Sequence, residues 1–186
     1  MNKYCFGYLF WGFFFIFASF RIQGLDIFPD VVGYVLFFLA FKGLKGYSSY
    51  FRKANICNTP MIFLSVFNLY QQPITAQTGG INLGTNGIWS IPLAIATAAL
   101  GILTVYYLLK GISEMALIRA RHDIIEKSEQ QWKHYLFYQI AVLLMFIVVF
   151  IPGLGLGYII FLFMLSIIVM FSLMRFMSFC KENLTY

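Results

Sequence analysis

The sequence predicts an all-α fold, a polytopic bundle of about six transmembrane helices in three hairpins, with the N- and C-termini cytoplasmic. Hydrophobic residues make up 61% of the 186 residues and charged residues only 11%, whereas about a quarter of a soluble domain is charged. A single soluble core of this length could not bury so much apolar surface. The apolar residues form continuous runs such as 161–174, which favours helices over the alternating pattern of a membrane barrel.

The six helices are expected at residues 4–20, 29–44, 55–72, 91–109, 135–151 and 158–174. The first run is longer than the apolar region of a signal peptide, about 7–15 residues, and therefore predicts an uncleaved helix. Pro29 suits the first turn of the second helix, where its missing N–H would have had no partner.

The third helix has a short apolar run, 61–70, which covers only about 15 Å of a hydrocarbon core of about 30 Å. Extension to 55–72, with Pro60 as a kink, gives nearly enough length to span. A re-entrant segment is the alternative. A basic loop is expected before it, at residues 45–58.

The placement of basic residues supports six spans. With a cytoplasmic N-terminus, every Lys and Arg except Arg21 falls on the cytoplasmic side. If 61–70 did not span, the basic residues from Lys110 to Lys133 would face outward, against the positive-inside bias. We therefore expect a multi-pass protein of the plasma membrane whose main partner is the lipid bilayer.

The segment 110–134 is expected to be a cytoplasmic amphipathic, charged element. Opposite charges four residues apart favour a helix, and the pairs are Lys110–Glu114, Arg119–Asp123 and Glu129–Lys133. The segment could continue the fourth helix or lie on the membrane surface. Residues 112–134 could also dock a protein partner, although a solvated helix is the simpler interpretation.

The sequence contains few residue patterns that would indicate catalysis, ion transport or metal binding. No charged residue or histidine lies in the middle of an expected helix, which disfavours a pump or proton-coupled carrier. We find no metal-ligand spacing, nucleotide loop or nucleophile with a recognisable base. An enzyme, a cofactor, a metal and a nucleic-acid partner are therefore not expected, and Cys5, Cys57 and Cys180 are expected to be free thiols. The oligomeric state stays open.

One polar cluster could form a ligand site or a structural contact. Its residues surround the start of the second helix: Arg21, Asp26, Pro29, Asp30, Gly33 and Tyr34. Asp26 and Asp30 would share a helical face if the helix began early. Their carboxylates could then cap the helix and complement its dipole, with Arg21 as the ion-pair partner. The alternative is an outward-facing site for a cation or a polar ligand.

The same stretch carries a resemblance. The pattern Pro-Asp-x-x-Gly-Tyr at 29–34, followed by Lys42-Gly43-Leu44 and Arg52-Lys53-Ala54, resembles a segment of uncharacterised small multi-pass membrane proteins of low-GC Gram-positive bacteria. The resemblance covers residues 24–54. It implies a plasma-membrane location and carries over no activity and no functional residue.

Two functions remain from these observations. The first is a non-enzymatic accessory or interaction protein of the membrane, favoured because catalytic residues are missing. The alternative is a small-solute transporter or channel with Asp26 and Asp30 at an outward-facing mouth.

Overall fold

The computed structural model describes residues 4–18, 21–22, 25–26, 29–67, 90–148 and 154–184. Within these residues the expected all-α class is confirmed, with six helices. They are α1 (Tyr4–Phe17), α2 (Asp30–Leu44), α3 (Ser49–Phe67), α4 (Ser90–Ile118), α5 (His122–Val148) and α6 (Gly155–Leu184). Between α1 and α2, the short strands β1 (Arg21–Ile22) and β2 (Leu25–Asp26) pair antiparallel.

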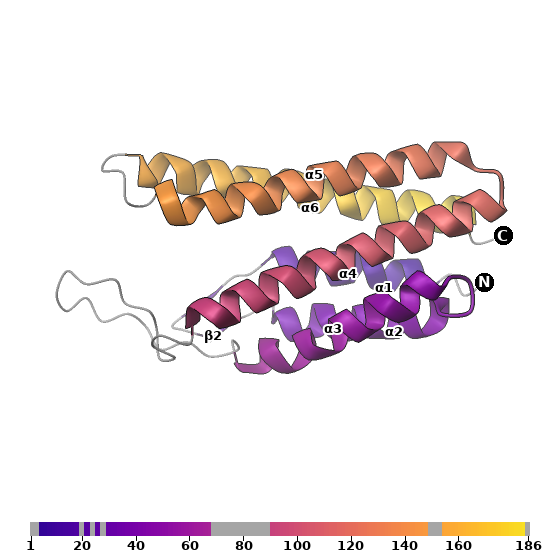
Figure 1. The fold of residues 1–186 in the computed structure, drawn as a ribbon, viewed down its shortest axis with the longest axis horizontal. Helices are drawn as coiled ribbons and strands as arrows, with labels where there is room; N and C mark the ends of the chain where they lie inside the picture. The colour runs from indigo at the N-terminus through magenta and orange to yellow at the C-terminus, as the bar shows by residue number, and fades with distance from the viewer. Residues whose placement is uncertain are drawn as a thin grey trace.

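The helices close into a ring. Each helix packs against its neighbours in sequence, and α1 also packs against α6. Successive helices run in opposite directions, so that the turns Lys45–Ser48 and Arg119–Arg121 lie at the same end of the bundle as both chain ends (Figure 1). We call this the basic end, because the Lys and Arg residues of the described helices and turns lie in this half of the bundle.

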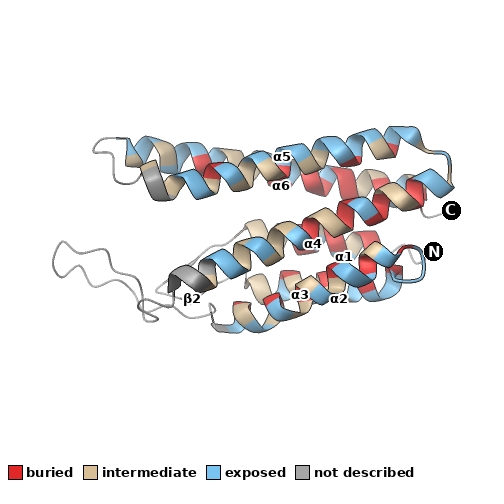
Figure 2. Ribbon diagram, viewed as in Figure 1, coloured by how far each residue is buried: buried red, intermediate tan, exposed pale blue. Residues whose placement is uncertain are grey.

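The core lies toward the basic end (Figure 2). Every helix supplies at least one side chain that is 0% exposed, and examples in chain order are Phe6, Phe41, Phe51, Leu108, Ile124 and Leu173. Aromatic rings pack across the helices, with the ring centroids of Phe13 and Phe37 4.9 Å apart in an edge-to-face arrangement. Aromatic pairs in this geometry add contact energy beyond the burial of their apolar area.

The crossing of α1 and α2 depends on two glycines. A Cβ on Gly33 would lie 2.8 Å from the carbonyl oxygen of Gly12 and 2.6 Å from Cγ1 of Ile16. A Cβ on Gly12 would lie 2.5 Å from ring carbons of Phe37. The absence of both side chains lets the two backbones approach closely, as small residues do in membrane bundles.

Several helices extend further than the sequence predicted. α3 begins at Ser49, so Arg52 and Lys53 lie in its first turns and the loop before it is only Lys45–Ser48. Ser48 acts as the N-cap, since its hydroxyl oxygen accepts the Tyr50 N–H at 3.1 Å. α6 continues to Leu184, ten residues past the expected end at 174. The expected residues 19–20, 68–72 and 149–151 lie outside the described part of the chain.

The charged segment expected at 110–134 continues the fourth helix over its first part, which was one of its two alternatives, and its cytoplasmic location stays a prediction. The segment consists of the last turns of α4, the turn Arg119–Arg121 and the first half of α5. Ala120 adopts a left-handed φ of 54°, and the Arg121 N–H donates to the Ala116 carbonyl at 2.9 Å. This Schellman-type ending satisfies the last carbonyls of α4 and reverses the chain.

The turn also separates a predicted ion pair. Arg119 and Asp123 do not share one helix, and Asp123 instead pairs with Arg121 at 2.9 Å. Arg119 donates to the carbonyl of Leu184 at the end of α6. Glu114, the acid of another predicted pair, accepts a hydrogen bond from Ser48. Arg119 and Glu114 therefore bond to other elements, where the spacing rule predicted contacts within one helix.

Two helices of the described chain, α4 and α6, are long and apolar enough to cross a membrane. This is weak support for a membrane location. The other described helices fall short of the same criterion by length or composition.

Candidate functional site

The predicted cluster is divided between the β1–β2 ladder and the start of α2. In the ladder the Cα partner of Arg21 is Asp26, and the partner of Ile22 is Leu25. Facing residues of an antiparallel pair have Cβ atoms about 5 Å apart, within reach of opposite charges. The backbone register therefore brings Arg21 and Asp26 together. The ion pair between their side chains stays a prediction.

Asp26 and Asp30 do not share a helical face, because Asp26 lies in β2 and α2 begins at Asp30. Pro29 occupies the N-cap position, with φ −62° and ψ 127°, and no side-chain cap hydrogen bond forms there. Its carbonyl accepts the Val32 N–H at 2.9 Å. Asp30 lies in the first turn, where a carboxylate complements the positive end of the helix dipole.

Gly33 and Tyr34 have structural partners. Gly33 is buried at the crossing with α1, where a side chain would collide with the Gly12 backbone. The backbone carbonyl of Tyr34 accepts a hydrogen bond of 2.8 Å from Nδ2 of Asn58. Both residues therefore fix α2 between α1 and α3.

Asn58, which sequence reasoning did not single out, is 0% exposed in the middle of α3. Within the described residues, Oδ1 of Asn58 and Oδ1 of Asn55 are buried and have no hydrogen-bond partner. Burying such a group without a partner costs free energy. The signal in the sequence was two asparagines three residues apart, which places them on one face of a helix.

Hydrogen bonds hold the basic end together. Ser48 donates to Glu114 and joins the α2–α3 turn to α4. Ser128 donates to the Leu109 carbonyl at 2.9 Å and joins α5 to α4. Arg121 donates to Oδ1 of Asn183 at 2.8 Å and joins the α4–α5 turn to α6.

The Arg121–Asp123 bridge shifts the pKa of both groups. The hydrogen bond from the Arg121 guanidinium lowers the pKa of the Asp123 carboxyl, and the same bond raises the pKa of Arg121. A carboxyl group whose pKa is lowered by folding stabilises the fold at pH values above its ordinary pKa. This stabilisation is lost as the pH falls through the pKa of the folded state. Both side chains are well exposed, so solvent keeps the contribution small.

Most apolar side chains of the expected docking segment 112–134 point into the core of the bundle. Ile112, Met115 and Ile124 are at most 3% exposed and belong to the core. Leu117 and Ile118 are the exception, with 61% and 75% of their surface exposed at the end of α4. We call these two residues the α4 tip.

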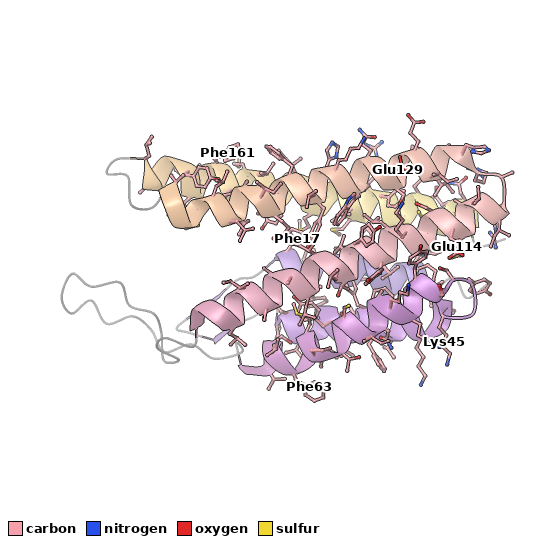
Figure 3. The ribbon with its side chains drawn as sticks, in the orientation of Figure 1. Phe17, Lys45, Phe63, Glu114, Glu129 and Phe161 are labelled. Carbon is pink, nitrogen blue, oxygen red and sulfur yellow. The ribbon has the colours of Figure 1, made fainter. Side chains whose placement is uncertain are left out.

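Cavities open between helices at the basic end. One of about 230 Å³ lies between α4 and α5, where Lys110, Lys133 and Glu129 contribute to its lining. Another, of about 470 Å³, lies at the α2–α3 turn and is lined in part by Lys45 and Glu114. Figure 3 places Lys45 and Glu114 toward this end and Phe161 toward the opposite one.

A groove of about 810 Å³ lies between α5 and α6.

Among the described residues, no group of three or more His, Cys, Asp or Glu side chains could hold a metal ion. Cys5 and Cys180 are buried free thiols, and Cys57 is a partly buried one.

Comparison with known proteins finds no relative for the chain. No protein-family model matches it, and neither a curated protein nor a solved structure matches it. The resemblance of residues 24–54 to a membrane-protein segment therefore stays a prediction, and the functional argument depends on the structure itself.

Proposed function

We propose that the chain is a multi-pass plasma-membrane protein with six spans that acts as a non-enzymatic accessory or interaction protein. A partner would dock at the α4 tip, on the cytoplasmic side. The observation that carries the proposal is the exposure of Leu117 and Ile118 at the basic end, where the surrounding surface is charged.

The ring arrangement supports six spans. α3 and α5 pack against α4, α1 and α5 pack against α6, and α2 lies between α1 and α3. A bilayer that holds α4 and α6, the two described helices long and apolar enough to cross it, would therefore also surround the other four. Every helix exposes a large apolar side chain that lipid could cover, and examples in chain order are Trp11, Leu39, Phe63, Ile95, Ile140 and Phe163. Soluble monomers rarely expose contiguous apolar surface on this scale.

The α4 tip would lie beyond the lipid. α4 has 29 residues and is therefore about 43 Å long, against a hydrocarbon core of about 30 Å. Lys110 is exposed and marks the interface, where lysines anchor helices. Ile118 lies about 12 Å further along the axis. We therefore propose that Leu117 and Ile118, exposed side by side outside the lipid, contact a protein partner.

A small-solute transporter with an Asp26/Asp30 mouth is the alternative. The buried carboxamide oxygens of Asn55 and Asn58 favour it, because they are polar groups inside the bundle. Against it, Thr104 is 2% exposed and donates to the Leu100 carbonyl of its own helix at 2.8 Å. Gln139 donates to the Tyr135 hydroxyl at 2.7 Å, also within one helix. These groups would therefore contribute little to a polar path.

Photo-crosslinking in intact membranes tests the proposal. We expect benzoylphenylalanine in place of Ile118 to give a discrete protein adduct. The same probe in place of Leu103, which is 40% exposed on the same helix, serves as the control and should crosslink only lipid. If neither position gives a protein adduct, or if both give the same one, the α4 tip is not a docking site.

A further inference from the structure

The groove between α5 and α6 has the features of a binding site for an amphipathic anion. Its volume is about 810 Å³, within the range of ligand pockets, about 300–1,000 Å³. The side chains that matter here are Lys127 and Gln131 from α5 and Ile168, Phe171, Ser172 and Arg175 from α6.

The sequence builds this groove by helical spacing. Lys127 and Gln131 are four residues apart, and Ile168, Phe171 and Arg175 follow at intervals of three and four, so that each set lines one helical face. Ser172 donates to Oε1 of Gln131 at 2.9 Å and joins the two faces. The carboxamide of Gln131 also carries two N–H donors.

The charge at one end of the groove is entirely positive. Every charged residue that lines it is basic, namely Lys127 and Arg175. The two other cavities described at the basic end each include a carboxylate, Glu129 in one and Glu114 in the other. Nζ of Lys127 lies 3.5 Å from the ring centroid of Phe179, a cation–π contact that restrains the ammonium group at the groove.

The other end of the groove is apolar. Ile168 and Phe171 are 64% and 59% exposed. They lie on the side of Arg175 away from the basic end, with Ile168 about 10 Å from Arg175 along the axis of α6. Phe163 and Met164 continue the exposed apolar surface on the same helix. A ligand that matches both ends carries an anionic head and a hydrocarbon tail.

We propose that the α5–α6 groove binds one anionic phospholipid. Its phosphodiester contacts Arg175 and Lys127, because guanidinium and ammonium groups form charge-assisted hydrogen bonds with phosphate oxygens. One acyl chain lies along Phe171 and Ile168. Basic pockets between helices on the cytoplasmic side of a membrane recognise anionic head groups in this way. This site goes beyond the accessory function proposed above and rests only on the proposed membrane location.

Native mass spectrometry of the full chain in mild detergent tests the site. We expect it to retain dioleoyl phosphatidylglycerol about tenfold better than dioleoyl phosphatidylcholine, which has the same acyl chains. The double variant Lys127→Gln/Arg175→Gln should lose this preference. The control Lys45→Gln/Arg52→Gln removes the same charge from the α2–α3 turn and the first turn of α3, and it should keep the preference. An unchanged groove variant, or equal losses in both double variants, would overturn the proposal.

Two further measurements test whether the groove binds a whole lipid or only a phosphate group. Excess inorganic phosphate should not displace phosphatidylglycerol from the wild-type chain, because the acyl chain contributes to binding; complete displacement would reduce the groove to an anion site and overturn the lipid assignment. Phe171→Ser, a change at an exposed residue, should weaken retention without removing charge, and unchanged retention would also count against the lipid.

Carbonate washing of membranes that contain each variant tests the location separately. Release of the chain into the wash would contradict the proposed membrane location. A chain that stays in the membrane but shows no preference for phosphatidylglycerol would overturn the groove assignment alone.

Discussion

Arg21 and Asp26 are the residues of the candidate site that the fold brings together most directly. Arg21 lies away from the basic end, and the antiparallel register sets it opposite Asp26. Asp30 starts α2 and lies outside the ladder. The sequence suggested either acid as the partner of Arg21, and the register favours Asp26.

A double-mutant cycle tests this pair. Arg21→Ala and Asp26→Ala should each lower the free energy of unfolding, and the double variant should lose about 0.5 kcal/mol less than the sum, the coupling typical of opposite charges facing each other across strands. The measurement is unfolding in mixed micelles followed by circular dichroism. The matched cycle of Arg21→Ala with Asp123→Ala, which lies at the basic end and pairs with Arg121, should be additive. Additive losses for Arg21 and Asp26 would show that no ion pair forms.

Residue-level prediction from the sequence had a clear limit. The importance of Asp30 for the start of α2 follows from local chemistry, because Pro29 fixes φ near the value that a helix start needs and an acid suits the first turn. The role of Asn58 depends on the carbonyl of Tyr34, which is distant in sequence. A contact between different helices leaves no local pattern, so it could not be predicted.

At the scale of helices, the crossing of α1 and α2 shows why Gly33 belongs to the candidate stretch. The Gly33 Cα lies against the Gly12 backbone, and a Cβ there would meet the carbonyl oxygen at 2.8 Å. A backbone atom cannot move away as a flexible side chain can. The glycine of the Pro-Asp-x-x-Gly-Tyr pattern is therefore explained by helix packing, without a ligand.

Gly33→Ala should destabilise the fold by about 1–3 kcal/mol, the usual cost of forcing extra atoms into a packed contact. Gly7→Ala on α1 is the matched control, because a Cβ at Gly7 meets nothing within 4 Å. This control should stabilise the helix by up to about 1 kcal/mol, since alanine is the better helix former. The melting temperature in detergent reports both. If both changes moved the melting temperature in the same direction, the close approach of α1 and α2 would be wrong.

The helix ends show which local signals mislead. Arg52 and Lys53 suggested a loop, yet both side chains are exposed on the first turns of α3, because long basic side chains can keep their charge in water while the helix continues. The sequence of residues 110–134 also left open where the fourth helix ends. The reversal occurs at Ala120 with a positive φ, and alanine carries no turn signal of the kind that glycine would have supplied.

At the scale of the whole molecule, the order of hairpins was predictable from charge, and the closure of the ring was not. Lys and Arg residues cluster at every second connection between apolar runs. In the structure, the turns at these connections lie together at the basic end. The contact of α1 with α6 and the α5–α6 groove both depend on how distant helices pack. Helical spacing places residues on one face of α5 or of α6, but no spacing in the sequence shows that these two faces meet or that α1 closes the ring against α6.

The basic end also sets the expected orientation in the membrane. If the positive-inside bias holds, this end faces the cytoplasm and the start of α6 faces outward. Glu126 is exposed near the start of α5, and Leu154 is 57% exposed just before α6. These two positions therefore lie on opposite sides of the bilayer in a six-span bundle.

Cysteine labelling in intact cells tests orientation and interior together. In a Cys57→Ser background, a membrane-impermeant maleimide should label Leu154→Cys from outside and should label Glu126→Cys only after the membrane is opened. Thr104→Cys should stay unlabelled in both conditions, because residue 104 is buried in the core at 2% exposure. Labelling of Glu126→Cys from outside would exclude the proposed topology. Labelling of Thr104→Cys from outside would instead reveal a water-filled path and favour the transporter over the accessory protein, since a packed core admits no hydrophilic reagent.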